Sequence, residues 1–160
     1  MKKALFLDRD GTINVDKGYV YKIEDFILID GICDMIKRFM QSGYLIIVVT
    51  NQSGIGRGYF SEEDVQILHR YADSILALQG VKVDKWYYCP HHPSCGMGAY
   101  KLDCNCRKPK TGMIEKAVKE FDIDVSKSLL VGDREEDIMC GKRMGMKSIY
   151  VTEFLKLSNV

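Results

Sequence analysis

Paired carboxylates follow the first apolar run of the chain, Ala4 to Leu7. Asp8 and Asp10 are two residues apart, so the alternation of an extended chain places both side chains on the same side. One carboxylate of such a pair can attack a phosphorus atom while its neighbour protonates the leaving oxygen. An ordinary polar turn uses the same residue types, with Gly11 supplying the tight bend. On this segment alone both interpretations stay open.

Two further apolar runs also end in groups suited to phosphate or a metal ion. Leu45 to Val49 leads into Thr50-Asn51-Gln52-Ser53, whose hydroxyl and amide groups can hold phosphate oxygens. Leu129 to Val131 leads into Gly132-Asp133. Three unrelated loops would seldom all carry such groups at the ends of buried strands. The pattern therefore favours a phosphate site with Mg²⁺. Asp8, Asp133 and the main-chain carbonyl of Asp10 would supply hard oxygen ligands to that ion.

A basic pair completes the predicted site. Arg107 and Lys108 come just before a helical segment that includes Met113. Lys108 would balance the acidic cluster and hold the transferring phosphoryl group, and Arg107 would clamp a second anionic part of the substrate. Taken alone, the pair is equally typical of a solvated basic turn.

The elements that must position these residues alternate between strands and helices. Apolar runs without alternation are typical of strands buried on both faces of a parallel sheet. Helical periodicity separates them, so we expect one α/β domain over residues 1–160 with a doubly wound, mainly parallel sheet. Ligands of such sheets bind beyond the carboxyl ends of the strands. The expected strands are Ala4–Leu7, Leu45–Val49, Leu129–Val131 and Ile149–Val151, with Val83–Cys89 as a further candidate, and the expected helices span 32–40, 61–76, 113–121 and 135–144.

Composition narrows the class of ligand. The 160 residues carry 23 basic and 22 acidic side chains, a net charge of +1, and 46% are hydrophobic. The sequence has no dense block of basic residues, which nucleic-acid or membrane-surface binding would require. It also has no segment long and apolar enough to span a bilayer. The expected ligand is therefore a small molecule, and the expected protein is a cytoplasmic monomer.

The combined motifs resemble those of the haloacid dehalogenase (HAD) superfamily of phosphotransferases. The resemblance implies that Asp8 forms an aspartyl-phosphate, and that Asp10 acts first as general acid and then as base. It further implies that Thr50 and Lys108 steady the phosphoryl group, and that Asp133 binds Mg²⁺. Asp137 would orient Lys108 or its loop rather than contact the metal. The four motifs occur in order as Asp8-x-Asp10-Gly11-Thr12, Thr50, Lys108 and Gly132-Asp133-x-x-x-Asp137.

A closer resemblance is to the branch that holds the heptose bisphosphate and histidinol-phosphate phosphatases. It is carried by residues 8–14, by Thr50-Asn51-Gln52-Ser53-Gly54-Ile55 and by Cys104-x-Cys106-Arg107-Lys108-Pro109. Arg134 stands where the heptose enzymes are expected to have lysine, which keeps the charge and changes the geometry. The implied substrate contacts are Asp16, Lys17, Gly18, Tyr19, Asn51, Gln52, Ser53, Arg107 and Arg134.

The resemblance implies removal of the 7-phosphate from a heptose 1,7-bisphosphate. Hydrolysis of histidinol phosphate is the nearest alternative, because that enzyme shares nearly every motif. A zinc-stabilised binding module without catalysis is a weaker alternative, since Asp8 and Asp10 are both present. A DNA-end phosphatase shares the Asp-x-Asp-Gly-Thr and Thr-Asn-Gln signals but would need a basic patch.

Four potential metal ligands lie in the segment 89–106. Cys89 and His91 form one close pair and Cys104 and Cys106 another, which is similar to the zinc loop of the same branch. Three thiolates and one imidazole would close a tetrahedral Zn²⁺ site and leave no position for water, so we expect a structural role in placing Arg107 and Lys108. Little chain remains for a large cap domain. The other cysteines and histidines are expected to be spare or structural: His92 and Cys95 as spares, Cys33 and Cys140 in the core, and His69 solvated on a helix.

Overall fold

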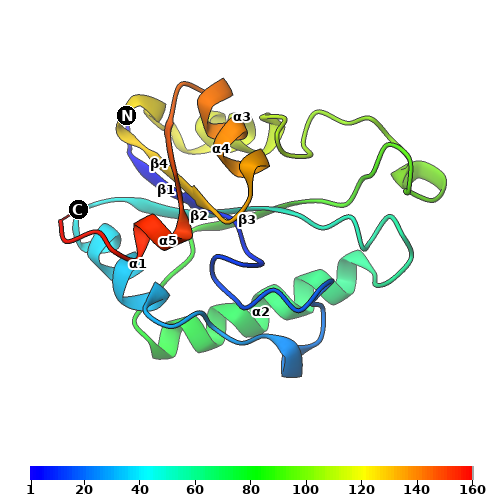
Figure 1. Ribbon diagram of the computed structural model, residues 1–160, viewed down its shortest axis with the longest axis horizontal. Coiled ribbons are helices and arrows are strands. Elements are labelled where there is room, and N and C mark those ends of the chain that lie inside the picture. The colour runs from blue at the N-terminus through cyan, green and yellow to red at the C-terminus, as the bar shows by residue number, and fades with distance from the viewer. Residues whose placement is uncertain (160) are drawn as a thin grey trace.

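All five strands of the protein run parallel in one sheet in the computed structural model, which describes residues 1–159 (Figure 1). The order is β3-β2-β1-β4-β5, with the first strand at the centre. The central strand is buried along its whole length, as the unbroken apolar run predicted. The strands are β1 Ala4–Leu7, β2 Leu45–Asn51, β3 Lys85–Cys89, β4 Leu129–Gly132 and β5 Lys147–Tyr150.

The last strand differs from the prediction. It spans Lys147–Tyr150 rather than Ile149–Val151, and Val151 begins a short helix, α5 (Val151–Phe154). β5 lies at the edge of the sheet, and only Ile149 among its four residues is buried. An edge strand needs no continuous apolar run, so the hydrophobic pattern alone misplaced it. Phe154 in this helix is fully buried, and Val160 lies outside the described residues.

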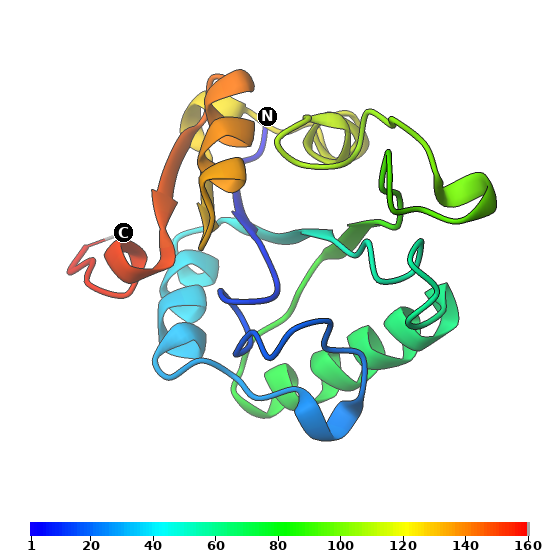
Figure 2. The same ribbon diagram turned by 45° about the vertical axis from the view of Figure 1, so that its right-hand side comes forward.

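Helices cover both faces of the sheet (Figures 1 and 2). On one face α1, α2 and α5 pack in the larger apolar core, and α3 and α4 pack in a second core on the other face. A capping box begins α2: Ser61 Oγ accepts from Asp64 N, and the Asp64 carboxylate accepts from Ser61 N. The bounds are α1 Ile32–Gln41, α2 Glu62–Leu78, α3 Gly112–Phe121 and α4 Glu135–Arg143, with 3-10 turns at Ile23–Asp25, Gly98–Tyr100 and Val125–Lys127.

The sheet topology marks the place for a ligand. Chain order reverses between β1 and β4, and the loops that leave these neighbouring strands diverge to opposite faces. Asp8 and Asp133 follow the carboxyl ends of these two strands directly. No cap domain is inserted between the elements of residues 1–159, so this crevice opens to solvent. In the same range, no helix is both long and apolar enough to cross a bilayer.

Candidate active site

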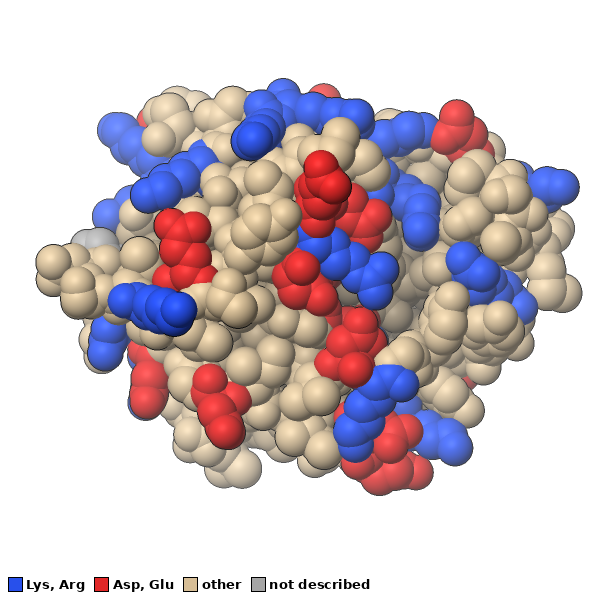
Figure 3. All heavy atoms as spheres, in the orientation of Figure 1, with Lys and Arg blue, Asp and Glu red and all other residues tan. Residues whose placement is uncertain are grey.

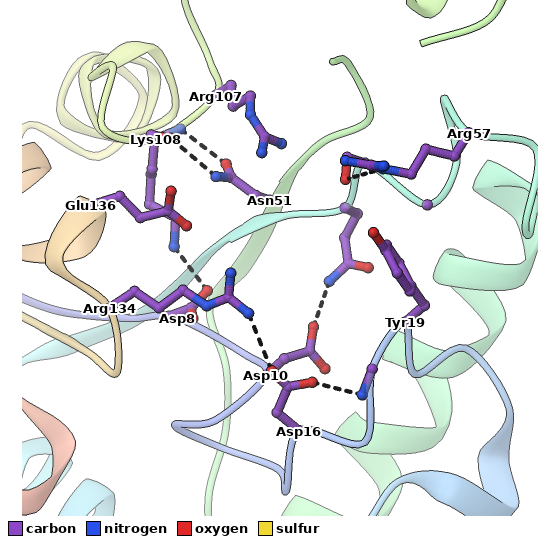
Figure 4. A pocket seen from close by; sticks show the side chains of 14 residues that line it. Asp8, Asp10, Asp16, Tyr19, Asn51, Arg57, Arg107, Lys108, Arg134 and Glu136 are labelled. Carbon is purple, nitrogen blue, oxygen red and sulfur yellow. Dashed lines mark hydrogen bonds and ion pairs between the residues drawn. The ribbon is translucent and has the colours of Figure 1, made fainter. Parts of the chain in front are cut away.

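A pocket of about 250 Å³ lies at the carboxyl ends of β1, β2 and β4 (Figure 4). Its walls come from the loops after these strands, from the start of α4 and from the segment before α3. Most of the residues predicted for catalysis and substrate contact meet there, although they are far apart in the sequence. The lining residues are Asp8, Asp10, Asp16, Gly18, Tyr19, Asn51, Gln52, Ser53, Gly54, Arg57, Arg107, Lys108, Arg134 and Glu136.

Lys108 is the buried cation at the base of this pocket. Its Nζ donates to Asp8 Oδ1 at 2.8 Å, to Asp137 Oδ1 at 2.6 Å and to the carbonyl of Val49 at 2.8 Å. Burial opposes its charge, but the two carboxylates outweigh burial and raise the pKa of Lys108 above its ordinary value. The ammonium group is therefore charged, and all three of its protons are used.

The carboxylates opposite Lys108 experience the same burial. Burial raises the pKa of Asp8, and the charge of Lys108 works against that shift. Burial also raises the pKa of Asp133, against the charge of the neighbouring Arg134. Both carboxyl groups are consequently harder to ionise than exposed ones, and a cation beside them would favour the carboxylate form.

The donor set at this point fits a hard divalent cation. Carboxylate oxygens of Asp8, Asp133 and Asp137 lie within 4.8 Å of one another, and Asp133 Oδ1 is buried with no hydrogen-bond partner. Asp137 already accepts from Lys108 and from the main-chain nitrogen of Arg134. The oxygens that remain available to Mg²⁺ therefore belong to Asp8 and Asp133, the two side chains predicted as its ligands.

Gly11 makes room for Asp133. Its φ of +84° lies in the left-handed region, and a Cβ atom at this position would overlap the Asp133 carboxylate. The loop after β1 can therefore approach the loop after β4 closely only with glycine at this position.

Asp10 is held by donors from three side chains. Its carboxylate accepts from Arg9 Nη2 at 3.0 Å, from Asn14 Nδ2 at 3.0 Å and from Gln52 Nε2 at 2.9 Å. Gln52, predicted as a substrate contact, lines the pocket, but its amide nitrogen Nε2 donates to Asp10 and to the hydroxyl of Thr50. These bonds fix the direction in which Asp10 faces the pocket.

Arg9 and His69 form a buried pair behind Asp10, and neither role was found in the sequence. Arg9 is fully buried, and its Nη1 lies 3.2 Å from His69 Nε2. The prediction that His69 is solvated is wrong: the side chain is 5% exposed and its ring stacks on Trp86 at a centroid distance of 4.2 Å. The helical pattern did not indicate this burial, because the aromatic partner comes from β3. Burial, and then the charge of Arg9, lower the pKa of His69 to about 3, so it is a neutral acceptor for Arg9.

Thr50 and Asn51 lie at the carboxyl end of β2, beside Lys108. Asn51 binds the main chain of Lys108 twice: its Oδ1 accepts from the nitrogen at 2.9 Å and its Nδ2 donates to the carbonyl at 3.1 Å (Figure 4). β2 extends beyond the predicted end at Val49 to include both residues. Thr50, predicted to steady the phosphoryl group, is 1% exposed and absent from the pocket lining, and its hydroxyl accepts from Gln52 Nε2 at 2.9 Å.

The predicted zinc ligands also meet in space. The Sγ of Cys106 lies 3.4 Å from both His91 Nδ1 and Cys104 Sγ, and Cys89 Sγ lies 3.5 Å from Cys104 Sγ. Cys89 Sγ also lies 3.6 Å from His91 Nδ1 and 2.8 Å from Cys106 Sγ. With Zn–S bonds of about 2.3 Å, a tetrahedral site places its ligand atoms roughly 3.8 Å apart, so the four residues fit Zn²⁺ once the two sulfur atoms of Cys89 and Cys106 move apart by about 1 Å. His92 and Cys95 are outside the cluster: His92 Nδ1 accepts from the main-chain nitrogens of Ser94 and Cys95, and Cys95 is exposed. Cys140 is buried as expected and Cys33 is half-buried.

The rim of the pocket carries charges of both signs. Arg134 reaches across to Asp16 at 3.4 Å, and Asp16 in turn accepts from the main-chain nitrogen of Gly18. Acidic and basic side chains are interspersed on the face of the molecule shown in Figure 3. Lys17 is exposed and is absent from the lining, unlike the other predicted contacts of this loop. Arg57 and Glu136 line the pocket without having been predicted. The glycines on both sides of Arg57 were the available signal, because they place a cation in a loop at a strand end.

Similar proteins agree with this geometry. Residues 105–153 match the model of a HAD-hydrolase-like family. The chain is 53% identical over 141 residues to the D-glycero-beta-D-manno-heptose-1,7-bisphosphate 7-phosphatase of Haemophilus influenzae, which covers 88% of this chain and 76% of that one. The chain belongs to the heptose-1,7-bisphosphate 7-phosphatase family of HAD-like hydrolases.

Both anomeric branches of the heptose-1,7-bisphosphate 7-phosphatases are among its relatives. The D-glycero-alpha-D-manno-heptose-1,7-bisphosphate 7-phosphatase of Burkholderia mallei is 50% identical over 144 residues, 90% of this chain and 76% of that one. The crystal structure of the D,D-heptose 1,7-bisphosphate phosphatase of B. bronchiseptica, complexed with magnesium and phosphate, superimposes with a TM-score of 0.81 at 31% identity. That match covers 91% of this chain and 78% of the other.

Proposed function

We propose that this protein is a Mg²⁺-dependent phosphatase that removes the 7-phosphate of D-glycero-D-manno-heptose 1,7-bisphosphate. The observation that supports this most strongly is the convergence of Asp8, Asp10, Lys108 and Asp133 on one crevice in a member of this family. We also propose that its product serves heptose biosynthesis, for the sugars of lipopolysaccharide, capsule or S-layer, and we place the enzyme in carbohydrate metabolism.

Asp8 and Asp10 divide the covalent chemistry between them. A carboxylate oxygen of Asp8 attacks phosphorus, the bond from phosphorus to the sugar oxygen breaks, and Asp10 donates its proton to that oxygen. A water molecule then attacks the aspartyl-phosphate, Asp10 accepts its proton, and inorganic phosphate leaves with Asp8 restored. Asp10 suits this exchange because Arg9, Asn14 and Gln52 hold its carboxylate in one direction throughout.

Positive charge at the base of the pocket supports both steps. Lys108 lies against Asp8 and is fixed by Asp137, so it neutralises charge on the phosphoryl oxygens as they approach the nucleophile. Asp8, Asp133 and the main-chain carbonyl of Asp10 would hold Mg²⁺. When bound, this ion neutralises phosphate charge and keeps Asp8 ionised against the effect of its burial.

Zn²⁺ held by the four-residue cluster would have a structural role. Cys106 is the last ligand and directly precedes Arg107 and Lys108. A closed metal site, together with the two bonds from Asn51, fixes the start of this segment before substrate arrives. We also propose that the enzyme acts as a monomer on a small sugar bisphosphate.

The decisive experiment measures phosphate release with Mg²⁺ from the alpha and beta anomers of the heptose bisphosphate and from histidinol phosphate. We expect kcat/KM to be highest for one heptose anomer. A preference for histidinol phosphate would contradict the proposal. Turnover should disappear in Asp8→Asn, which removes the nucleophile and keeps the size of the side chain. Turnover that persists unchanged in this variant would contradict the aspartyl-phosphate route, and a folded wild-type protein without any turnover would favour the binding-module alternative.

A further inference from the structure

Two arginines without carboxylate partners border the pocket. Arg57 comes from the loop between β2 and α2, and Arg107 comes from the segment after the zinc cluster. Neither forms an ion pair within residues 1–159, whereas Arg134 is paired with Asp16 and Lys108 with two carboxylates. Arg107 Nη1 is also buried without a hydrogen-bond partner. A buried guanidinium nitrogen with no acceptor is costly, and a bound anion would remove that cost.

The two guanidinium groups are separated from the reacting carboxylates. In Figure 4 both lie on the side of the pocket opposite Asp10 and Asp16, with Arg107 entering from the top of the view and Arg57 from the right. Asp8 and Lys108 mark the place of the phosphoryl group that is cleaved. The pocket therefore has one site in which cations are already matched by carboxylates and a second in which positive charge has no partner.

Arg57 is held in place by its own neighbours. Its Nε donates to Ser53 Oγ at 3.3 Å, and its guanidinium carbon lies 5.7 Å from the centre of the Tyr19 ring. Tyr19 is supported in turn by an edge-to-face contact with Tyr59 at 4.9 Å, and it has a positive φ of 50°, which only a well-held non-glycine residue adopts. These contacts leave both terminal nitrogens of Arg57 free for a bidentate bond to an anion.

We propose that Arg57 is a specificity-determining residue that, with Arg107, binds the second phosphate of a sugar bisphosphate, the one that is not hydrolysed. The inference rests on the proposed function and adds a residue and a substrate requirement to it. Tyr19 then acts as a support for Arg57 rather than chiefly as a contact to the sugar. Ser53 has the same role from the other side of the guanidinium group.

The test compares a bisphosphate with the matching monophosphate. For wild type, Arg57→Gln and Arg57→Lys, kcat/KM is measured for the heptose 1,7-bisphosphate and for heptose 7-phosphate. Inhibition constants of both compounds are measured against p-nitrophenyl phosphate, which carries no second anion. Arg70→Gln is the matched control, because Arg70 is an exposed arginine of α2 that does not line the pocket.

We expect wild type to prefer the bisphosphate, and Arg57→Gln to lower the bisphosphate-to-monophosphate ratio of kcat/KM by roughly 10- to 100-fold, the worth of one charge-assisted bond. The ratio of inhibition constants should change in parallel. Arg57→Lys should fall between the two, since it keeps the charge and loses the planar fork. Arg70→Gln should retain the wild-type ratio.

Two results would overturn the inference. The first is an equal loss on both compounds in Arg57→Gln, which would show a merely structural role. The second is a wild-type enzyme that binds the bisphosphate no more tightly than the monophosphate. The proposed function is judged separately, by whether wild type releases phosphate from the heptose bisphosphate at all, so failure of one statement is distinguishable from failure of the other.

Discussion

The buried pair of Arg9 and His69 predicts an unusual dependence of stability on pH. His69 has a pKa of about 3 in the folded protein, against an ordinary value of 6.5. Between these two values the unfolded chain binds a proton at this residue and the folded chain does not. The free energy of unfolding therefore falls as pH decreases below 6.5, and the contribution of His69 to stability is complete only above that value.

The size of the effect follows from the two pKa values. A difference of one pH unit below 6.5 corresponds to about 1.4 kcal/mol at a fully titrating site. At pH 5 the loss relative to pH 7.5 is therefore about 2 kcal/mol, a large fraction of the stability of a typical domain. The side chain is 5% exposed, so solvent screening reduces this figure little.

The perturbation that isolates this residue is His69→Gln. Glutamine keeps an acceptor for Arg9 Nη1 and cannot be protonated, so the bond at 3.2 Å has a replacement. Urea unfolding of both proteins from pH 7.5 to pH 5, at one zinc concentration, gives two curves of stability against pH. All other ionisable groups are common to both and cancel in the difference. The wild-type curve should fall below the variant curve by about 2 kcal/mol more at pH 5 than at pH 7.5. Parallel curves would refute the buried neutral histidine.

Three further perturbations test the frame of the site. Lys108→Met removes the ammonium group between Asp8 and Asp137. We expect kcat to fall by roughly 100- to 1000-fold in a variant that circular dichroism shows to be folded. A fall of less than about tenfold would contradict the role of Lys108. Cys104→Ser should lose zinc, measured by metal analysis, and most turnover; full activity in verified zinc-free protein would disprove the positioning role of the cluster. Gly11→Ala introduces a Cβ against Asp133. It should raise the Mg²⁺ concentration for half-maximal activity by about tenfold or more, and lower the free energy of unfolding by roughly 1–2 kcal/mol. An unchanged Mg²⁺ titration would argue against Asp133 as a ligand.

The parts of the site that the sequence predicted are those set by the ends of buried strands. Asp8 and Asp133 follow runs that are apolar on both faces, and the parallel topology then brings their carboxylates to one edge. The zinc cluster was predictable for a related reason, since each pair of ligands is only two residues apart and needs one loop to meet the other. The link between Asp137 and Lys108 was implied by family resemblance, and the structure shows the bond.

The parts that were missed depend on contacts between elements. Arg9 lies between Asp8 and Asp10, so alternation turns it away from the pocket and into the interior, where an isolated guanidinium group would be very costly. Its burial becomes favourable only because its guanidinium group donates hydrogen bonds to Asp10, to His69 and to the carbonyl of Val20. Nothing in the local pattern of α2 reveals that His69 is one of these partners. Arg57 was missed for a similar reason, because its place in the pocket depends on how Ser53 and Tyr19 fold around it.

The two ends of the pocket differ in how firmly they are built, and this difference bears on how such an enzyme can evolve. Lys108 is buried and makes three short bonds, so nearly any change there disturbs both chemistry and folding. Arg57 is half-buried and rests on one 3.3 Å hydrogen bond and the face of an exposed ring. Replacing it costs the fold little. Substrate range is thus the property of this molecule most open to mutational drift, and new specificities can arise on its rim while the phosphoryl-transfer apparatus stays constant.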